Sequence, residues 1–461
     1  DQLKRVCRRI RDRHERDWRD DSQENTGDGK KIFKPFLDNL DESKLGDLWN
    51  HLLLAYQYVN ILEDSAVGMG LTIATLQVGV IPYETLSRHV TTMLQKRERQ
   101  NAQEYEAWRH AKDITLDHCN QIYQMLRVTL RREDVRGESE YNEDLPGVVG
   151  SLQVAGWAVE SDGAMCVFPE GFRNKEGEPL PFIIQKSDGA YLYATTDLAA
   201  LRYRINELKA HVIIYVTDAR QKLHFEMLFA VADKAGWARR DNLKHVPFGS
   251  ILGEDGTPLK TRSGESVKLK ELLDEAVERA RAIVEEKNPD LSEEKKKEIA
   301  KAVGIGAVKY ADFSNNRTSD YVFSFDKMLA MEGNTAPYMQ YAYARIRSIE
   351  RKAQTKGVDI ETELAGVTEP SLSEPTELDL AKHLIRYAEA VNAAAADYRP
   401  NYLTTYLYEL AQKFSAFYTN CPVLDAGQDK RPTRLLLCDV TARTIGHGLS
   451  NLLGIEVVEQ M

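Results

Sequence analysis

The chain has 461 residues, of which 43% are hydrophobic and 29% are charged, and its formal net charge is −10. This length exceeds what one ordinary hydrophobic core holds, so we expect two or three domains. The acidity argues against non-specific DNA binding, although a local basic surface could still bind shaped RNA. Apolar stretches end before the roughly 18 residues of a membrane span, so we expect no membrane partner.

Five cysteines are scattered along the chain, with no Cys-x-x-Cys pair and no histidine at ligand spacing. This pattern argues against a zinc site or a disulfide framework and favours a reducing compartment. The first residues are charged rather than apolar and show no secretory signal. We therefore expect a cytoplasmic protein that binds no metal ion of its own.

Residues 1–100 predict a mostly helical segment of no recognisable fold. Acidic and basic side chains alternate over residues 8–17, as in a solvated helix with ion pairs, and a basic RNA-binding arm is the alternative. Residues 40–62 carry apolar side chains at helical spacing. Gly68-Met69-Gly70 is a weak signal for a phosphate-binding loop, and close helix packing explains it more simply.

The middle of the chain predicts a mixed α/β domain. A helical pattern over residues 104–130 precedes short strands and polar turns. Thr195 or Thr196 would cap a helix over residues 197–209. The other predicted elements are strands at residues 165–168, 182–185, 191–194, 212–216 and 246–252, and a helix at residues 224–235. The order strand, helix, strand from residue 212 to residue 252 predicts half of a parallel sheet.

Beyond residue 266 the sequence is almost entirely helical. Amphipathic patterns cover residues 267–288, 292–311, 335–354, 377–397, 402–420 and 431–452. A stretch rich in Pro, Glu and Thr, at residues 356–377, is the one convincing linker in this half. The fold class predicted from these patterns is therefore α/β followed by all-α.

Three polar side chains follow strands of the predicted sheet. Tyr193 and Asp197 lie at the end of one strand, and Gln221 comes shortly after the strand at residues 212–216. A phenol, a carboxylate and a carboxamide suit a planar cationic group that only donates hydrogen bonds, which describes guanidinium. The alternative is that Asp197 only caps the helix that follows its strand.

Several segments, in a fixed order, carry a resemblance to a known family. They are Arg136-Gly137-Glu138-Ser139 with Leu145-Pro146-Gly147, Tyr191-Leu192-Tyr193-Ala194-Thr195-Thr196-Asp197, Asp218-Ala219-Arg220-Gln221 with His224, Lys260-Thr261-Arg262-Ser263-Gly264, Val303-Gly304-Ile305-Gly306-Ala307-Val308-Lys309-Tyr310 and Glu332-Gly333-Asn334-Thr335-Ala336-Pro337-Tyr338-Met339-Gln340-Tyr341. From about residue 105 to the C-terminus, the chain resembles the arginine-specific class I aminoacyl-tRNA synthetases. The resemblance implies a partial Rossmann-like catalytic core with an insertion over residues 101–265. It also implies a helical anticodon-binding domain over residues 266–461.

The resemblance also implies roles for individual residues. Tyr193, Asp197 and Gln221 would bind the arginine side chain. Lys260 and Arg262 would be catalytic, because they lie in a glycine-containing loop that closes on the phosphates of ATP. His224, Lys260 and Thr261 would contact ATP. A solvated basic hairpin is the alternative for the loop, and a packed histidine is the alternative for His224.

The partners implied by the resemblance are L-arginine, ATP with Mg²⁺, and tRNA, bound by a monomer. Arg345, Arg347 and Tyr341 interleave cations with an aromatic ring, which suits single-stranded RNA loops. The alternative is that Tyr338, Tyr341 and Tyr343 form the seam between the core and the helical half. We prefer the seam for most of these tyrosines and RNA contacts for the arginines.

One signature of class I synthetases, His-x-Gly-His, does not occur in the sequence. The pairing Gly446-His447-Gly448 lies in a helical context and does not replace it. Three functions therefore stay open at this point. They are an arginine–tRNA ligase, a non-catalytic paralogue that binds tRNA or arginine, and a scaffold in which residues 1–100 form an interaction module.

Overall fold

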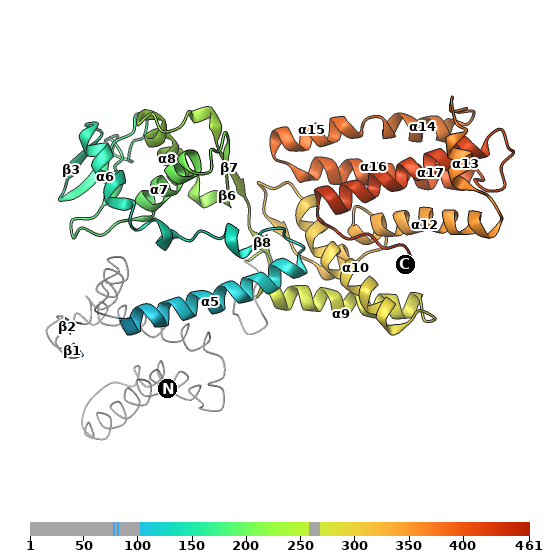
Figure 1. Ribbon diagram of the computed structural model, residues 1–461, viewed down its shortest axis with the longest axis horizontal. Coiled ribbons are helices and arrows are strands. Elements are labelled where there is room, and N and C mark those ends of the chain that lie inside the picture. The colour runs from blue at the N-terminus through green and yellow to red at the C-terminus, as the bar shows by residue number, and fades with distance from the viewer. Residues whose placement is uncertain (1–76, 79–80, 83–101, 258–267) are drawn as a thin grey trace, which may run out of the picture. The chain divides into compact units, whose positions relative to one another are not determined.

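The computed structural model describes residues 77–78, 81–82, 102–257 and 268–461 (Figure 1). The chain divides into two compact units, Asp1–Asp117 and His118–Met461. In the first unit, β1 (Gln77–Val78) pairs in antiparallel fashion with β2 (Ile81–Pro82). Helix α5 (Ala102–Met125) confirms the helix predicted near residue 104 and continues into the second unit. The predicted helix at residues 40–62 lies outside the described residues.

The first half of the second unit is the predicted α/β region (Figure 1). Strands β3 (Ala158–Ser161), β4 (Ala164–Val167) and β5 (Phe182–Gln185) form an antiparallel sheet in that order. Strands β6 (Ile213–Asp218) and β7 (Leu243–Phe248) pair in parallel, which confirms the predicted half-sheet. The helices are α6 (Leu145–Val154), α7 (Tyr193–Asn206) and α8 (Lys222–Lys234), and short 3₁₀ turns lie at Arg132–Asp134, Glu138–Tyr141, Ala219–Gln221 and Arg240–Asn242.

The alternation of side chains along β6 fixes how the parallel pair packs. Ile213 and Tyr215 are buried, and the Tyr215 ring lies 5.4 Å from the ring of Phe229 on α8. Ile214 and Val216 point to the opposite face and are exposed. This period of two is the strand pattern that the β-branched run predicted. Parallel sheets usually bury both faces. In the described part of the chain, by contrast, this pair is covered on one face only.

Helix α7 begins earlier than the sequence predicted. It starts at Tyr193, with Leu192 as its N-cap, so Thr195 and Thr196 do not cap it and residue 191 only forms an isolated bridge with Gln185. Thr195 is fully buried in the first turn, and its hydroxyl donates a hydrogen bond to the carbonyl oxygen of Ile184 in β5. This contact between distant segments holds the start of α7 against β5, and helix-capping preference alone could not reveal it.

The strand predicted at residues 246–252 divides at Gly249. Strand β7 ends at Phe248, and β8 (Ile251–Leu252) pairs instead with β9 (Tyr321–Val322). A Cβ atom on Gly249 would lie 2.6 Å from the backbone of Ser319, so only glycine permits this close approach. The segment that follows β7 therefore packs closely against the loop before β9.

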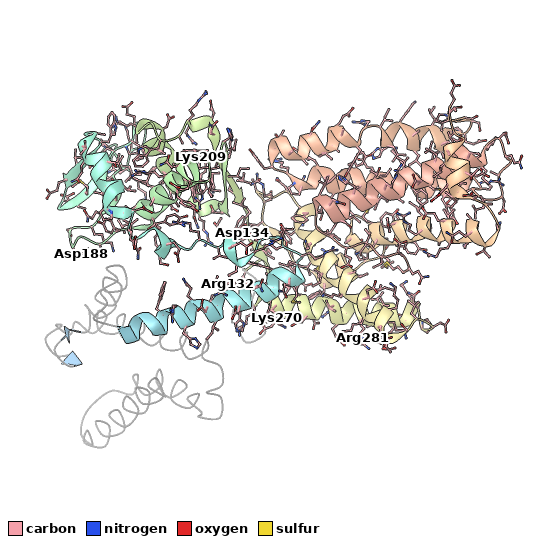
Figure 2. All side chains as sticks on the ribbon, in the orientation of Figure 1. Arg132, Asp134, Asp188, Lys209, Lys270 and Arg281 are labelled. Atoms are coloured by element: carbon pink, nitrogen blue, oxygen red, sulfur yellow. The ribbon has the colours of Figure 1, made fainter. Side chains whose placement is uncertain are left out.

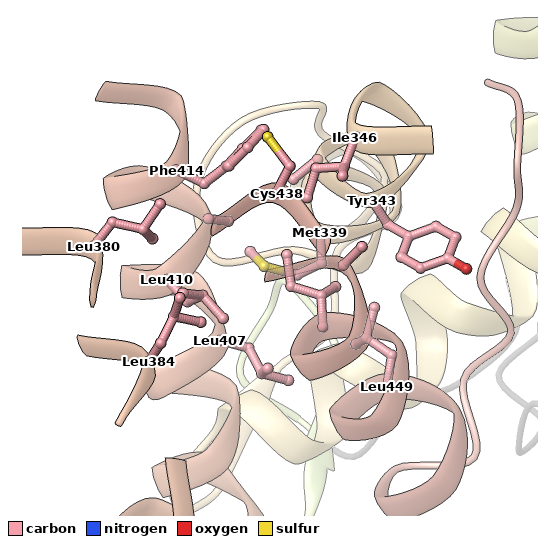
Figure 3. Packing of buried hydrophobic residues seen from close by; sticks show 14 of the residues in the cluster. Met339, Tyr343, Ile346, Leu380, Leu384, Leu407, Leu410, Phe414, Cys438 and Leu449 are labelled. Atoms are coloured by element: carbon pink, nitrogen blue, oxygen red, sulfur yellow. The ribbon is translucent and has the colours of Figure 1, made fainter. Parts of the chain in front are cut away.

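The second half of this unit is helical, as predicted. Its helices are α9 (Leu269–Lys287), α10 (Glu293–Ser314), α11 (Phe325–Met328), α12 (Ala336–Thr355), α13 (Ile360–Ala365), α14 (Pro375–Leu384), α15 (Tyr387–Asp397), α16 (Pro400–Asn420) and α17 (Arg431–Gly446), with a π-helix at His447–Leu452. Figure 3 shows Met339, Leu407, Leu410 and Leu449 meeting in its core. Figure 2 shows the charged side chains of Lys270 and Arg281 on α9, where they pair with Asp274 and Glu285 one turn away.

The predicted helix at residues 377–397 is two helices, α14 and α15. The hydroxyl of Tyr406 donates to the carbonyl oxygen of His383 at 3.0 Å and contacts that of Leu384 at 3.4 Å. These carbonyls lie at the end of α14, where the regular helical hydrogen bonds end and the Arg386 backbone N–H also donates to that of His383. The helix is therefore interrupted at the point where Tyr406 of α16 hydrogen-bonds to the last carbonyl oxygens of α14.

The predicted linker at residues 356–377 is wrong as a linker, because it is ordered and packed. It contains α13, whose N-cap Asp359 accepts a hydrogen bond from the Thr362 backbone N–H. The guanidinium of Arg431 on α17 binds the carboxylate of Glu363. The hydroxyl of Thr433 accepts a hydrogen bond from the backbone of Ser371. Two of the acidic side chains in this stretch, Glu363 and Glu377, therefore pair with arginines of α17 instead of facing solvent.

Replacing Arg434 by Met should destabilise the helical half strongly. Arg434 Nε donates to Glu377 Oε1 at 2.7 Å, and these side chains are only 6% and 1% exposed. Removing one partner leaves a buried charge unpaired, which costs about 3–5 kcal/mol. Arg386→Met is the control, because its pair with Glu389 is exposed and should be worth about 1 kcal/mol or less. Urea unfolding of each variant measures both values, and equal losses would contradict the prediction.

The stability that Glu377 contributes should disappear in acid. Burial by itself raises the pKa of this carboxyl, but hydrogen bonds from the Glu374 and Ser373 backbones and from Arg434 lower it below its usual range. A lowered pKa stabilises the fold above the unfolded value of about 4.3 and stops doing so as the pH falls through the folded value. The difference in unfolding free energy between the wild type and Glu377→Gln should be constant near pH 7 and shrink below about pH 4. Urea titrations across this pH range would refute the prediction if the difference stayed constant.

Candidate active site

The start of α7 presents two of the predicted residues on one side of the helix. Tyr193 and Asp197 are four residues apart, so they lie one above the other on the helix surface. The Tyr193 side chain is 71% exposed, whereas Asp197 is partly buried. The buried hydroxyl of Thr195 fixes this turn against β5. Both side chains are therefore presented by a rigid helix rather than by a strand end.

Asp197 has a direct partner on the next helix. His224, near the start of α8, places its Nε2 2.7 Å from Asp197 Oδ2. The imidazole is held by two buried rings, Phe182 on β5 at 5.7 Å and Phe225 on α8 at 5.2 Å. The structure thus brings together Asp197 and His224, which the sequence assigned to two different ligands.

The turn between β6 and α8 positions Gln221. Asp218 at the end of β6 accepts hydrogen bonds from the backbone and guanidinium of Arg220, and these lower the pKa of the Asp218 carboxyl to about 2. Gln221 ends the 3₁₀ turn and is exposed at the start of α8. Within the described residues, no hydrogen bond joins Gln221 to Tyr193 or Asp197.

A second carboxylate near Asp197 was missed from the sequence. Glu138 begins the 3₁₀ turn Glu138–Tyr141, and its pKa is raised by burial and, to a smaller degree, by the negative charge of Asp197. Its signal in the sequence was the Arg136-Gly137-Glu138-Ser139 segment, which marked the family without a role for the carboxylate. The two acids together suit a cation with several N–H donors better than either acid alone.

The arginines near these carboxylates are bound elsewhere. The guanidinium of Arg136 lies 3.8 Å from the centre of the Tyr203 ring, and Arg204 donates to the Tyr215 hydroxyl at 3.1 Å. Burial raises the pKa of Tyr215 to about 12, although Arg204 partly opposes this. Each cation is therefore held by an aromatic side chain, and no ion pair joins either one to Asp197 or Glu138 within the described residues.

A cleft lies at the carboxyl ends of β6 and β7. In open parallel sheets, ligands bind at this edge. Its volume is about 960 Å³. The lining includes Val216 and Phe248 from the sheet, Asp312 from α10, Tyr321 from β9 and Leu403 from α16. Burial raises the pKa of Asp312, and the Tyr321 hydroxyl contacts its carboxylate at 3.3 Å. The cleft offers apolar walls and a few polar groups, the usual composition of a ligand site.

Arg317 closes one side of this cleft. Its Nε donates to the carbonyl oxygen of Tyr398 at 2.8 Å, and its Nη1 donates to that of Pro247 at the end of β7. Burial lowers the pKa of this guanidinium, and the nearby Arg399 lowers it further. The contact joins the carboxyl end of β7 to the turn between α15 and α16.

The predicted catalytic loop cannot be placed. Lys260, Thr261 and Arg262 lie within residues 258–267, outside the described residues. The turn before them is confirmed, because the Gly253 backbone N–H donates to the Thr257 carbonyl oxygen at 2.8 Å. Their roles therefore stay predictions.

The predicted RNA-binding residues lie on α12. Arg345 donates to the Tyr341 hydroxyl at 2.8 Å and lies over the rings of Tyr341 and Tyr418. Arg347 donates to both carboxylate oxygens of Glu350 and to the hydroxyl of the buried Tyr343. Both guanidiniums make contacts within the protein, and Arg347 makes the stronger ones. Binding of RNA by these residues stays a prediction.

Within the described residues, no helix is both long enough and apolar enough to cross a lipid bilayer. No group of three His, Cys, Asp or Glu side chains in the described ranges has the arrangement of a metal site.

Comparison with known proteins extends this geometry to a family. Residues 81–325 match the family described as tRNA synthetases class I (R), catalytic domain, and residues 339–461 match the DALR anticodon binding domain. The arginine–tRNA ligase of Chromobacterium violaceum is 51% identical over 355 residues, which cover 77% of this chain and 60% of that relative. The chain thus spans about three-fifths of the length of the curated relatives that it matches.

Solved structures support the same relationship. The arginyl-tRNA synthetase of Plasmodium falciparum matches with a TM-score of 0.69 at 29% identity, covering 82% of this chain and 62% of that one. The Thermus thermophilus arginyl-tRNA synthetase matches with a TM-score of 0.67 at 26% identity, covering 82% and 67%. These matches confirm the predicted fold class, an α/β synthetase core followed by a helical domain. The chain therefore belongs to the arginine (R) family of class I tRNA synthetases.

Proposed function

We propose that this protein is an arginine–tRNA ligase, which attaches arginine to its tRNA through an arginyl-adenylate formed with ATP. The observation that carries the proposal is the Asp197 carboxylate, which His224 holds at 2.7 Å at the start of α7 in a class I core, with the Glu138 carboxylate near enough for the two charges to repel. The curated relative from Chromobacterium violaceum, named arginine–tRNA ligase, supports the reaction class. The protein would act as a monomer in the cytoplasm.

The arginine side chain would bind between α7 and α8. Asp197 uses Oδ2 for His224, and its Oδ1 makes no hydrogen bond within the described residues. That oxygen and the Glu138 carboxylate would accept N–H donors of the guanidinium, which has five in a rigid fork. Tyr193, exposed one turn before Asp197, and Gln221, exposed at the start of α8, would complete the contacts. A lysine substrate would lose this match because its ammonium is a compact point charge.

The nucleotide would occupy the cleft at the carboxyl ends of β6 and β7, with Mg²⁺ arriving on its phosphate oxygens. The arginine carboxylate attacks the α-phosphorus of ATP, and pyrophosphate leaves. The terminal ribose hydroxyl of tRNA then attacks the adenylate carbonyl, and AMP leaves. No side-chain nucleophile is needed, so positioning and charge stabilisation supply the catalysis. Lys260 and Arg262, with Thr261, would stabilise the charge on pyrophosphate, and His224 would lie close to the substrates.

The tRNA would bind through residues 339–461, which match the anticodon-binding family. Tyr341 and Arg345 offer a stacked ring and cation, and such pairs bind unpaired bases and phosphates. Arg347 would support this surface by fixing α12 through Glu350.

One sequence observation favours a second candidate function. The missing His-x-Gly-His signature would favour a paralogue that binds tRNA or arginine but forms no adenylate. Loss of one transition-state donor typically costs about 100- to 1,000-fold in rate. The two candidates share the arginine and tRNA sites and differ only in adenylate formation.

Arginine-dependent exchange of pyrophosphate into ATP, with tRNA present, should occur and should depend on Asp197. Asp197→Asn keeps the shape and removes the charge, so arginine affinity should fall by about 2 kcal/mol or more, measured by calorimetry. Glu170→Ala, which changes a 94% exposed carboxylate, is the control and should leave both readouts unchanged. Arginine binding without exchange in the wild type would establish the paralogue instead. Absence of both would refute the ligase, and it would also refute the paralogue if tRNA binding were absent as well.

Binding of tRNA should weaken steeply as salt increases. Phosphate contacts release counterions, so log affinity falls linearly with log salt. If Arg345 contacts a phosphate, Arg345→Gln should reduce that slope by about one. Arg281→Gln on α9 is the matched control, since its guanidinium already pairs with Glu285 and Glu293. Filter binding across a salt series measures each slope, and an unchanged slope for Arg345→Gln would remove this residue from the interface.

A further inference from the structure

We propose that His224 is a positioning residue, which orients the Asp197 carboxylate so that its second oxygen faces the substrate guanidinium. This inference rests on the proposed function and adds to it a role for the imidazole. The contact joins Nε2 of His224 to Oδ2 of Asp197 at 2.7 Å, within the range of charge-assisted hydrogen bonds. It links α7 to α8, and these helices carry different parts of the site.

An aspartate needs such a partner to hold one orientation. The last torsion of its side chain is broad and roughly two-fold, so the helix backbone alone does not fix the plane of the carboxylate. A hydrogen bond to one oxygen removes that freedom and leaves the other oxygen directed outward. The same bond also offsets the repulsion between Asp197 and the neighbouring Glu138 carboxylate.

The imidazole is itself held in a fixed direction. Phe182 lies 5.7 Å from it at a tilt of 36°, and Phe225 lies 5.2 Å away nearly edge-on, at 81°. Phe225 in turn stacks on His245 of β7 at 4.9 Å. The orientation of Asp197 therefore depends on the packed core of the sheet through three rings in sequence. Ordering of this kind reduces the entropy that binding must overcome.

The geometry favours positioning over direct contact with the nucleotide. Nε2 of His224 is already engaged by Asp197 Oδ2, so this ring nitrogen is not open to a phosphate. Phe182 and Phe225 contact the imidazole ring and hold it in this orientation. His224 thus acts on the substrate through Asp197.

The test compares His224→Gln with His224→Asn in the full chain. The Gln amide nitrogen reaches close to the position of Nε2, whereas the shorter Asn amide places its donor nearer to Nδ1. Both substitutions are polar and neutral but differ in length, so a merely structural role would show as a change in thermal stability that accompanies any change in arginine affinity. Calorimetric titration with L-arginine gives the affinity, and tRNA affinity and thermal unfolding report the state of the rest of the protein.

Wild type and His224→Gln should bind arginine within about threefold of one another, and His224→Asn should bind about tenfold more weakly, as expected for losing a hydrogen bond to a charged group. The tRNA affinities should stay equal. Equal arginine affinities for all three proteins would overturn the positioning role and leave the proposed function intact. Equal losses in both variants would also overturn it. A wild type that binds no arginine would instead overturn the proposed function, and the positioning role with it.

Discussion

One half-buried ammonium group joins three distant parts of the chain. Lys309 on α10 donates to the carbonyl oxygen of Leu126, just after α5, at 2.7 Å, and to that of Gly454, just after the π-helix, at 2.6 Å. Burial lowers the pKa of this amine, and the carbonyls compensate for the water that it loses. Gly454 has a positive φ of 61°, and a Cβ there would lie 2.8 Å from Nζ. This contact holds the end of α5, which precedes the α/β region along the chain, against α10 and the C-terminal segment.

The arginines next to the proposed arginine site are held by aromatic side chains. Arg136 lies over Tyr203, and Arg204 binds the hydroxyl of Tyr215, so neither neutralises the nearby carboxylates. Aromatic rings and phenols bind a guanidinium more weakly than a carboxylate does. In the proposed site, Asp197 and Glu138 would therefore remain open to the guanidinium of a substrate.

Local patterns predicted the elements well, and contacts between distant segments decided the rest. The β-branched run before Asp218 and the helical periodicities beyond residue 266 predicted β6 and the helical half, because burial of one face imposes these periods. The start of α7 depends on Thr195 meeting Ile184, and the proximity of Glu138 to Asp197 depends on the packing of a 3₁₀ turn against α7. Periodicity within a segment reflects which of its faces is buried and not which distant residue it contacts. Neither contact could therefore be predicted from the sequence.

The Arg317 contact determines which of its three positions can be substituted without breaking the connection between β7 and α16. Both of its acceptors are main-chain carbonyls, at Pro247 and Tyr398, and every residue type supplies that atom. Side chains at these two positions can therefore drift while the connection between β7 and the turn before α16 persists, provided that residue 398 tolerates its left-handed backbone. Position 317 itself cannot vary in the same way, because its side chain supplies both donors. A change at position 317 removes donors that no substitution at the other two positions can restore.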